Sequence, residues 1–216
     1  MKIALILIAG LGLLAIVALL AFVYVVQNVE QPTYSVLVQD DDFEIRDYPA
    51  LVIAEVRRGG TRQQGLSAGF GPLARYIFAK ERGGDEPIAM TAPVVQQQIG
   101  SGDPIAMTAP VMQARNEQGD WAVHFIMPAE YRLDTLPAPA GKDVRLTETA
   151  PRRVAVVRFS GRTTDVLLAR REQSLRRWME ASGLTPVGAP LYAYYNDPFT
   201  PGFMRRNEVM IGVAED

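Results

Sequence analysis

The chain has one histidine, His124, and this side chain is the one best suited to acid–base chemistry or metal binding at neutral pH. An imidazole can also serve as the axial ligand of a haem iron. Catalysis by His124 would require a nucleophile beside it. We identify no serine elbow that suits this role, and the sequence has no cysteine. We therefore predict no catalytic residues and no enzyme activity.

The surroundings of His124 also argue against a role as a metal ligand. It lies in residues 121–127, the most strand-like segment of the sequence. Trp121, Val123 and Phe125 occupy one face of this strand. Because side chains alternate along a strand, His124 is expected on the other face, toward solvent. We therefore expect no metal site.

Two methionines could also bind iron, because a thioether is a known axial ligand of haem. They are Met90 and Met107, at equivalent positions of an octapeptide, Pro-Ile-Ala-Met-Thr-Ala-Pro-Val, that occurs at residues 87–94 and again at 104–111. Both are flanked by apolar residues, and methionine in such a setting usually fills a hydrophobic core. We expect two core methionines and a duplication that extends a hairpin or its loop.

The acidic residues form no pattern that would bind a metal or act in catalysis. Three consecutive aspartates at 40–42 fit a solvated turn, and the acids at 85, 86 and 103 flank the octapeptides as turn residues. No Walker loop is present. The net charge of −2 gives no electrostatic reason to expect binding of nucleic acid, which requires a basic surface.

An amphipathic helix is predicted after the glycines at 59 and 60. Thr61 and Gln64 have the spacing of a capping box at its start. Gly69, Gly71 and Pro72 within the helix predict a kink or a close approach to a neighbouring element. Apolar side chains at spacings of four, three and four residues share one face, which on its own would pack on a sheet. These residues are Leu66, Phe70, Leu73 and Ile77.

Strands and a second helix account for the rest of an α+β domain. The second helix, residues 164–181, is expected to bury Leu168, Leu175, Trp178 and Met179. Residues 48–59 align with residues 150–161, and a helix follows each segment. This repeat predicts one domain, residues 34–216, built from two β-α-β-β-like halves about a pseudo-twofold axis. Strands are expected at 34–38, 43–48, 51–56, 121–127, 144–148, 153–159, 191–195 and 208–213.

Residues 3–26 carry no charge and are long enough to cross a bilayer. As a helix they would span about 36 Å, and the hydrocarbon core is about 30 Å thick. A cleaved signal peptide is the alternative, but residues 22–26 lack the small residues of a cleavage site. We expect residues 1–26 to be a retained transmembrane anchor and residues 27–33 a linker. Lys2 precedes the apolar helix, so the positive-inside rule places the domain outside the cytoplasm, in the periplasm if the source is bacterial.

Several stretches resemble the SOUL haem-binding protein family and occur in the family's order. They are Phe-Glu-Ile-Arg-Asp-Tyr-Pro at 43–49, Ile-Ala-Met-Thr-Ala-Pro-Val in the octapeptides, Phe-Ile-Met-Pro at 125–128 with residues 131 and 135–137, and Tyr-Tyr-Asn-Asp-Pro-Phe at 194–199 followed by Arg-Arg-Asn-Glu-Val at 205–209. Together they cover essentially all of residues 34–213. The resemblance implies a distorted antiparallel β-barrel with two packed helices, which agrees with the two predicted halves.

The resemblance also implies a ligand, because family members bind haem or related tetrapyrroles noncovalently in a surface cleft beside the first helix. Such a site needs an apolar wall for the macrocycle and cations for its propionates. The apolar face of the first helix offers the wall. The pair at 205–206 is followed by Glu208, and such pairs more often form structural ion pairs than a propionate clamp. The candidate cations are Arg75, Lys80, Arg205 and Arg206.

One position departs from the family pattern. Some vertebrate members are thought to bind iron through a histidine just before the tyrosine of the Glu-Ile-Arg-x-Tyr motif, and here that residue is Asp47. A carboxylate is a poor haem ligand, so haem would bind here through hydrophobic contact, without a strong axial ligand. Two functions therefore stay open. The first is a membrane-anchored haem or tetrapyrrole protein that buffers or transfers its ligand. The second is an interaction module for a protein or a small amphipathic molecule, by analogy with the similar doubled architecture of bacterial effector-binding domains.

Overall fold

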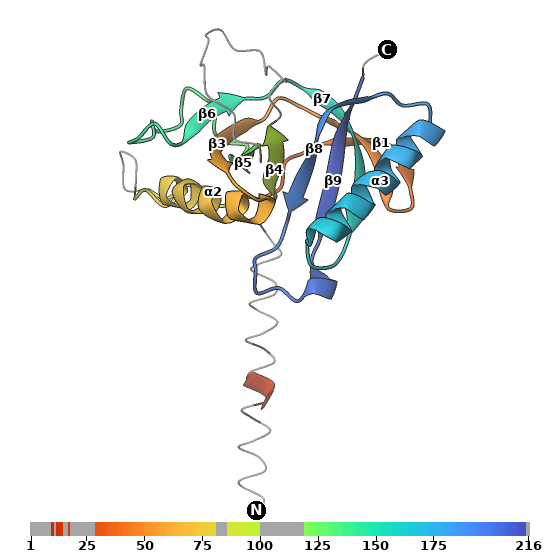
Figure 1. Ribbon diagram of the computed structural model, residues 1–216. Helices are drawn as coiled ribbons and strands as arrows, with labels where there is room; N and C mark the ends of the chain where they lie inside the picture. The colour runs from red at the N-terminus through yellow and green to blue at the C-terminus, as the bar shows by residue number, and fades with distance from the viewer. Residues whose placement is uncertain are drawn as a thin grey trace, which may run out of the picture.

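The computed structural model describes residues 29–80, 86–99 and 119–214, together with residues 10, 12–14 and 17 (Figure 1). Two α-helices and nine strands lie in the ranges from 29 onward, so the domain is α+β, as predicted. The helices are α2 (Arg62–Ile77), α3 (Asp165–Ala181) and the short 3-10 helix η1 (Gly202–Met204). The strands are β1 (Ser35–Asp40), β2 (Phe43–Tyr48), β3 (Val52–Gly59), β4 (Val94–Ile99), β5 (Asp120–Ile126), β6 (Arg145–Glu148), β7 (Arg152–Phe159), β8 (Pro186–Tyr194) and β9 (Asn207–Val213).

All nine described strands belong to one antiparallel sheet, in the order β1-β2-β7-β9-β8-β4-β5-β3-β6. The sheet is open, and the prediction of a closed barrel is therefore wrong. Closure would require β1 to pair with β6. Instead, β1 pairs with β2 and β6 pairs with β3, so each edge strand has one described neighbour.

The strand order repeats on the two sides of the β8–β4 pair. One half is β8-β9-β7 and the other is β4-β5-β3, and in each half the helix follows the strand that comes first in the chain. Thr61 caps α2 and forms the predicted capping box with Gln64, while Thr164 caps α3. Nε of Arg62 lies 2.6 Å from Oδ1 of Asp165, so the first residues of the two helices are joined by an ion pair across the halves.

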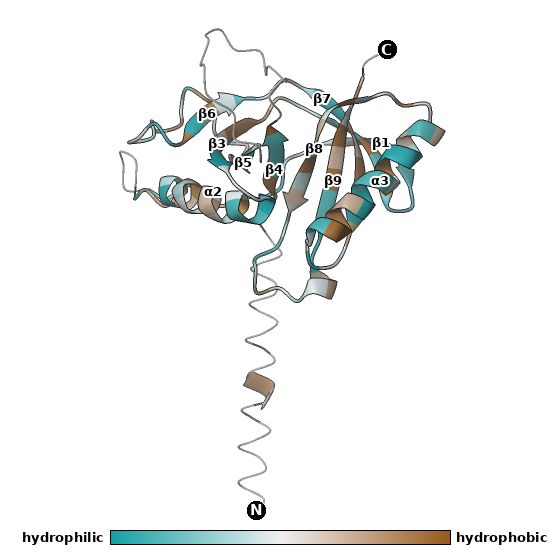
Figure 2. Ribbon diagram, in the orientation of Figure 1, coloured by the Kyte–Doolittle hydropathy of each residue, from teal (hydrophilic) through white to brown (hydrophobic). Residues whose placement is uncertain are grey.

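Each helix covers the same face of the sheet, over its own half (Figure 1). Leu73, Tyr76 and Ile77 of α2 are buried against β3 and β5. The α3 residues predicted to be buried are Leu168, Leu175, Trp178 and Met179. Three of them are fully buried against β7 and β9, and Trp178 is partly buried. Figure 2 shows both hydrophilic and hydrophobic residues along α3, as expected of a helix with one buried side.

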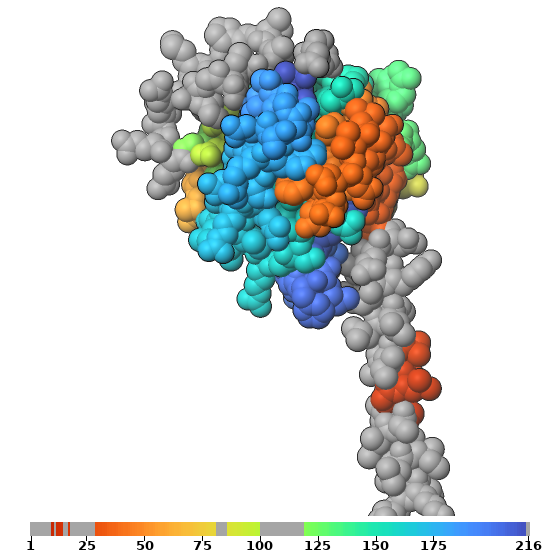
Figure 3. Space-filling model, turned by 90° about the vertical axis from the view of Figure 1, so that its right-hand side faces the viewer, coloured from red at the N-terminus to blue at the C-terminus, as the bar shows by residue number. Residues whose placement is uncertain are grey.

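The opposite face of the sheet forms a third core that both halves share. Ile53 and Ile126 come from one half, and Val154 and Met210 come from the other. Strand β1 extends the sheet beside α3, as Figure 3 shows from the side. There Nε1 of Trp178 donates a hydrogen bond of 2.8 Å to Oδ2 of Asp40. On the face without helices, the side chains of the two halves pack against each other in this shared core.

Gly69 determines how closely α2 approaches β5, as predicted for this part of the helix. A Cβ atom at residue 69 would lie 2.7 Å from Cγ2 of Val123, which is closer than such atoms approach in a folded core. We expect Gly69→Ala to lower the free energy of unfolding by about 1 to 2 kcal/mol, because overpacking costs about 1 to 3 kcal/mol and the helix propensity of alanine returns up to about 1 kcal/mol. Thermal unfolding followed by circular dichroism would measure this loss.

Gly71 provides a matched control on the same helix. A Cβ atom there would contact Nη1 of Arg75 at 3.4 Å, which the long side chain can accommodate. Gly71 precedes Pro72, whose ring crowds a Cβ atom on the residue before it, so the helix propensity gained is offset and Gly71→Ala should stay within about 1 kcal/mol of neutral. Equal losses at residues 69 and 71 would show that contact with Val123 is not what requires a glycine.

Two predicted features fall largely or wholly outside the described residues. The apolar segment 3–26 is described only at residues 10, 12–14 and 17, and in the described part of the chain no helix is long and apolar enough to span a bilayer. The second octapeptide, with Met107, belongs to the connection between β4 and β5 and lies outside the described residues. In the first octapeptide, Met90 is partly buried against the core under α2, as predicted.

Candidate ligand-binding site

A pocket of about 420 Å³ lies on the face of the sheet opposite α2. Small-molecule sites commonly measure about 300 to 1,000 Å³, so this pocket can hold a ligand. Strands β3, β4, β5 and β6 and the start of β7 line it. The apolar lining is Leu51, Ile53, Val95, Ile126 and Ala150. The polar lining is Glu55, Arg57, Gln97, His124, Arg145, Thr147, Glu148, Thr149 and Arg152.

Strand alternation explains why polar residues gather in this pocket. In β5, Val123 packs toward α2, so its neighbour His124 points to the other face of the sheet. The strand register then places Glu55 of β3 and Val95 of β4 directly opposite His124. Three adjacent strands therefore bring one imidazole, one carboxylate and one apolar side chain to the same level of the pocket.

His124 is buried, with 8% of its surface exposed, and the prediction that it faces solvent is wrong. The predicted face is correct, but the shared core and the pocket lie on that face. Nε2 of His124 lies 3.0 Å from Oε2 of Glu55. A carboxylate can only accept hydrogen bonds, so Nε2 carries the hydrogen and, in the neutral ring, the lone pair is on Nδ1.

Glu55 is a buried carboxylate that keeps its charge. Burial alone would raise its pKa, but hydrogen bonds from His124 and Arg57 outweigh burial and hold the pKa at about 2. Nε of Arg57 donates to Oε1 of Glu55 at 2.7 Å. The charges of Glu55 and Arg57 therefore compensate each other within the pocket at neutral pH.

Arg152 brings a positive charge to the pocket without an acidic partner among the described residues. It is the first residue of β7, lies opposite Tyr48 of β2, and shares its face with Val154. Nε of Arg152 is buried and has no hydrogen-bond partner in the described part of the chain. Burial lowers the pKa of Arg152 from the usual arginine value. An arginine nevertheless stays charged at neutral pH.

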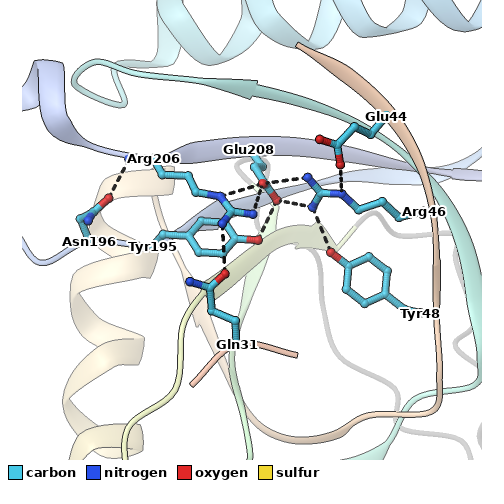
Figure 4. A network of polar contacts seen from close by, with 8 residues as sticks. All are labelled: Gln31, Glu44, Arg46, Tyr48, Tyr195, Asn196, Arg206 and Glu208. Atoms are coloured by element: carbon cyan, nitrogen blue, oxygen red, sulfur yellow. Dashed lines mark hydrogen bonds and ion pairs between the residues drawn. The ribbon is translucent and has the colours of Figure 1, made fainter. Parts of the chain in front are cut away.

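A second polar cluster lies in the other half of the sheet and is satisfied internally (Figure 4). Arg46 donates from both Nη atoms to the buried carboxylate of Glu208, at 2.9 and 3.1 Å. Arg206 donates to the same carboxylate at 2.7 and 3.0 Å, and the hydroxyl of Tyr195 donates at 2.7 Å. Burial alone would raise the pKa of Glu208, but the hydrogen bonds and charge of Arg46 lower it. We interpret this cluster as structural.

Solved structures with the same fold have little sequence in common with this chain. The C-terminal domain of EcmrR superposes with a TM-score of 0.55 over 85% of this chain and 99% of that domain, at 11% identity. A hydrolase from Listeria innocua superposes with a TM-score of 0.53 over 82% of this chain and 94% of its own, at 10% identity. Identities this low show a shared fold alone. A search of the curated proteins gives no match.

The family model of the SOUL haem-binding protein matches residues 29–212. The chain belongs to the SOUL haem-binding protein family. The resemblance inferred from the sequence motifs is therefore confirmed, and the family supports noncovalent haem as a ligand.

The wall predicted for a SOUL ligand along α2 is only partly accessible. Leu73 and Ile77 are buried in the core under the helix. Leu66 is half-buried against the same core. Phe70 is 40% exposed, and its ring meets the ring of Phe125 edge-on, with centroids 5.2 Å apart. A ligand on this face would therefore contact the edge formed by Leu66 and Phe70.

The four predicted cations lie in two separate places. Arg75 and Lys80 are exposed at the C-terminal end of α2. Arg205 donates to two backbone carbonyl oxygens of its own loop, at 2.6 and 2.7 Å. Arg206 is held by Glu208, so the expected structural ion pair is present. The described contacts of Arg205 and Arg206 reach none of the predicted α2 residues.

Asp47 occupies the position at which some family members have a histidine. Asp47 lies at the surface and accepts hydrogen bonds of 2.8 and 2.9 Å from Arg153.

Ser67 is the centre of a Gly-Leu-Ser-Ala-Gly stretch at 65–69 that matches the G-x-S-x-G pattern and that we did not identify from the sequence. It is exposed within α2, on the other side of the sheet from His124. Ser67 therefore has neither the strand-to-helix turn nor the base of a serine nucleophile.

Proposed function

We propose that the protein is membrane-anchored, binds haem or a related tetrapyrrole noncovalently, and buffers this ligand or hands it over outside the cytoplasm. The observation that carries the proposal is the pocket opposite α2, which combines apolar walls with two arginines that have no acidic partner among the described residues, in a chain of the SOUL haem-binding family.

The residues of the pocket fit a tetrapyrrole. The macrocycle needs apolar surface, which Ile53, Val95 and Ile126 supply. The propionates need cations, and Arg145 and Arg152 line the pocket without acidic partners among the described residues. Haem would supply a redox-active iron when bound, while the pocket residues bind and orient the macrocycle.

Binding without a strong axial ligand is the expected mode. Nε2 of His124 donates to Glu55, so ligation of iron through Nε2 would break a buried hydrogen bond. Ligation through Nδ1 would keep that bond, and a preference for hemin over metal-free porphyrin would reveal it. Because Asp47 stands at the position of the family's histidine, hydrophobic contact and propionate binding are the main contributions in this proposal.

The anchored part of the proposal rests on the apolar sequence at 3–26 and is supported by the surface near residue 31. Nη1 of Arg206 donates to Oε1 of Gln31 at 3.0 Å, which places the start of the domain beside the loop that contains η1. Phe199 and Phe203 in this loop are 87% and 79% exposed. Exposed aromatic side chains suit the interface of a bilayer. A domain tethered at residue 27 would bring this loop to the membrane surface.

A second candidate function is an interaction module that recognises another amphipathic molecule or a protein. The same pocket favours the small-molecule form of this alternative, because its lining specifies an apolar body and an anionic group rather than iron. Haem is one member of that class of ligands.

Titration of the full chain with hemin, in detergent micelles and followed at the Soret band, distinguishes the two functions. We expect a saturable one-to-one shift, measured against micelles alone. Metal-free protoporphyrin IX should bind with comparable affinity, because no strong axial ligand contributes. A Soret change identical to that of micelles alone would rule out the haem proposal. Much tighter binding of hemin than of protoporphyrin IX would show that a side chain does bind the iron.

A further inference from the structure

The three arginines that line the pocket differ in how their charges are compensated. Arg57 donates to Glu55 at 2.7 Å and is matched. Arg145 is exposed, Arg152 is half-buried, and neither has an acidic partner in the described part of the chain. Nε of Arg152 is buried and has no hydrogen-bond partner among the described residues. Arg152 is therefore the less exposed of the two uncompensated charges in the lining.

A buried donor without an acceptor needs an explanation, because nearly all such groups in native proteins are paired. Nothing on β7 itself supplies one: the residues that follow on the same face, Val154 and Val156, are apolar. Tyr48 lies opposite in β2, and its hydroxyl accepts a hydrogen bond of 3.2 Å from Nη1 of Arg46 and none from Nε of Arg152. Because Nε has almost no accessible surface, an acceptor that enters the pocket would meet the exposed part of the Arg152 side chain, which would have to turn for Nε to be satisfied as well.

The rest of the lining defines what such an acceptor would be attached to. Leu51, Ile53, Val95 and Ile126 form an apolar wall within the same pocket. Carboxylate and phosphate are the anions that a guanidinium binds best, and it binds a carboxylate through two parallel hydrogen bonds. We propose that Arg152 is the receptor for the carboxylate of an amphipathic ligand, and that this ligand binds in the pocket opposite α2 rather than on the outer face of α2. The inference rests on the proposed function only for the choice of a porphyrin as the ligand.

The test compares protoporphyrin IX, which has two propionates, with its dimethyl ester, which has none. Affinities of the full chain in micelles are measured by porphyrin fluorescence for the wild type, Arg152→Gln and Arg153→Gln. The control residue, Arg153, is adjacent in β7, points to the other face, and pairs with Asp47. Thermal unfolding of each variant establishes that it is folded.

We expect the wild type to prefer the acid over the ester, and Arg152→Gln to lose this preference. The affinity of Arg152→Gln for protoporphyrin IX should fall by about 10- to 100-fold, the value of a hydrogen bond to a charged group converted at tenfold per 1.4 kcal/mol. Arg153→Gln should keep the preference of the wild type. If Arg152→Gln still prefers the acid as strongly as the wild type does, the inference is overturned and the proposed function is not.

A failure of the proposed function can be told apart from a failure of the inference about Arg152. If neither hemin nor protoporphyrin IX binds the wild type saturably, the proposed function fails. The fluorescent anion 8-anilinonaphthalene-1-sulfonate, an apolar body with a sulfonate, then replaces the porphyrin. Binding that weakens in Arg152→Gln and not in Arg153→Gln would still support Arg152 as the anion receptor. Binding that is equal in all three proteins would overturn it.

Discussion

Replacement of Glu208 by glutamine should lower the free energy of unfolding by about 3 to 5 kcal/mol, because two guanidinium groups would then converge on a neutral amide. Arg46 and Arg206 donate four hydrogen bonds of 2.7 to 3.1 Å to this carboxylate. Arg46 is 1% exposed, so water cannot replace the lost carboxylate. For a domain of this size the loss corresponds to a fall in Tm of about 6 to 20 °C. Circular dichroism of the full chain in micelles would measure it.

Two further variants make this result specific. Asp134→Asn disrupts an ion pair with Arg132 in which the side chains are 71% and 81% exposed. Such exposed pairs contribute less than about 1 kcal/mol. The double variant Arg46→Met/Glu208→Leu removes the two most deeply buried charges of the cluster and leaves the partly exposed Arg206 without its acid. It should therefore recover part of the loss seen in Glu208→Gln. A loss at Glu208 no larger than at Asp134 would contradict a buried, compensated charge.

The effect of Glu208→Gln should also depend on pH. Burial alone would raise the pKa of Glu208, but Arg46 and Arg206 lower it from the ordinary value of 4.5. Because the folded-state pKa is the lower one, the ionised carboxylate stabilises the fold above about pH 4.5, and this contribution is lost as the pH falls toward the folded-state pKa. The glutamine has no proton to gain. The difference in Tm between the two proteins should therefore shrink in acid, and a constant difference down to about pH 3 would argue against this origin.

Local patterns were sufficient to predict the helices but not the edges or every strand of the sheet. The capping box of Thr61 involves residues only three positions apart, so the start of α2 was predicted to the residue. β4 was missed because three consecutive glutamines, residues 96–98, hide its alternation. Gln96 is nevertheless fully buried, because its amide bonds to the carbonyl oxygen of Arg62 and the hydroxyl of Tyr194. Whether the sheet closes depends on two edge strands far apart in the sequence, and no local pattern reports it.

Local patterns were also insufficient to predict the residues of the pocket, because they do not show which strands pack together. Alternation placed His124 on the correct face of β5, but residues of the other half, such as Val154 and Met210, bury that face. One signal was present and not used. Glu55 interrupts the apolar run at 51–56, and a charge within a buried strand requires a partner. Only the register of β3 against β5 shows that the partner is the single histidine.

Arg152→Met should stabilise the protein, in contrast to most substitutions. Methionine is unbranched and apolar and reproduces the arginine side chain as far as the position of Nε, so it would pack beside Val154 without leaving a buried donor unpaired. An unsatisfied buried polar group costs about 1 to 3 kcal/mol, and more when it is charged. We therefore expect the free energy of unfolding to rise by about 2 kcal/mol, which thermal unfolding in the absence of porphyrin would measure.

Arg153→Met is the matched control, because it removes an arginine from the next position of β7, where the ion pair with Asp47 is exposed. Its effect should stay within about 0.5 kcal/mol. The decisive comparison is between stability and affinity in the same variant. If a side chain is retained for the fold, its replacement lowers both the stability of the protein and its affinity for the ligand. If it is retained for a ligand, its replacement lowers the affinity and raises the stability. If Arg152→Met destabilised the free protein, Arg152 would contribute to folding, and its unpaired charge would no longer indicate a ligand.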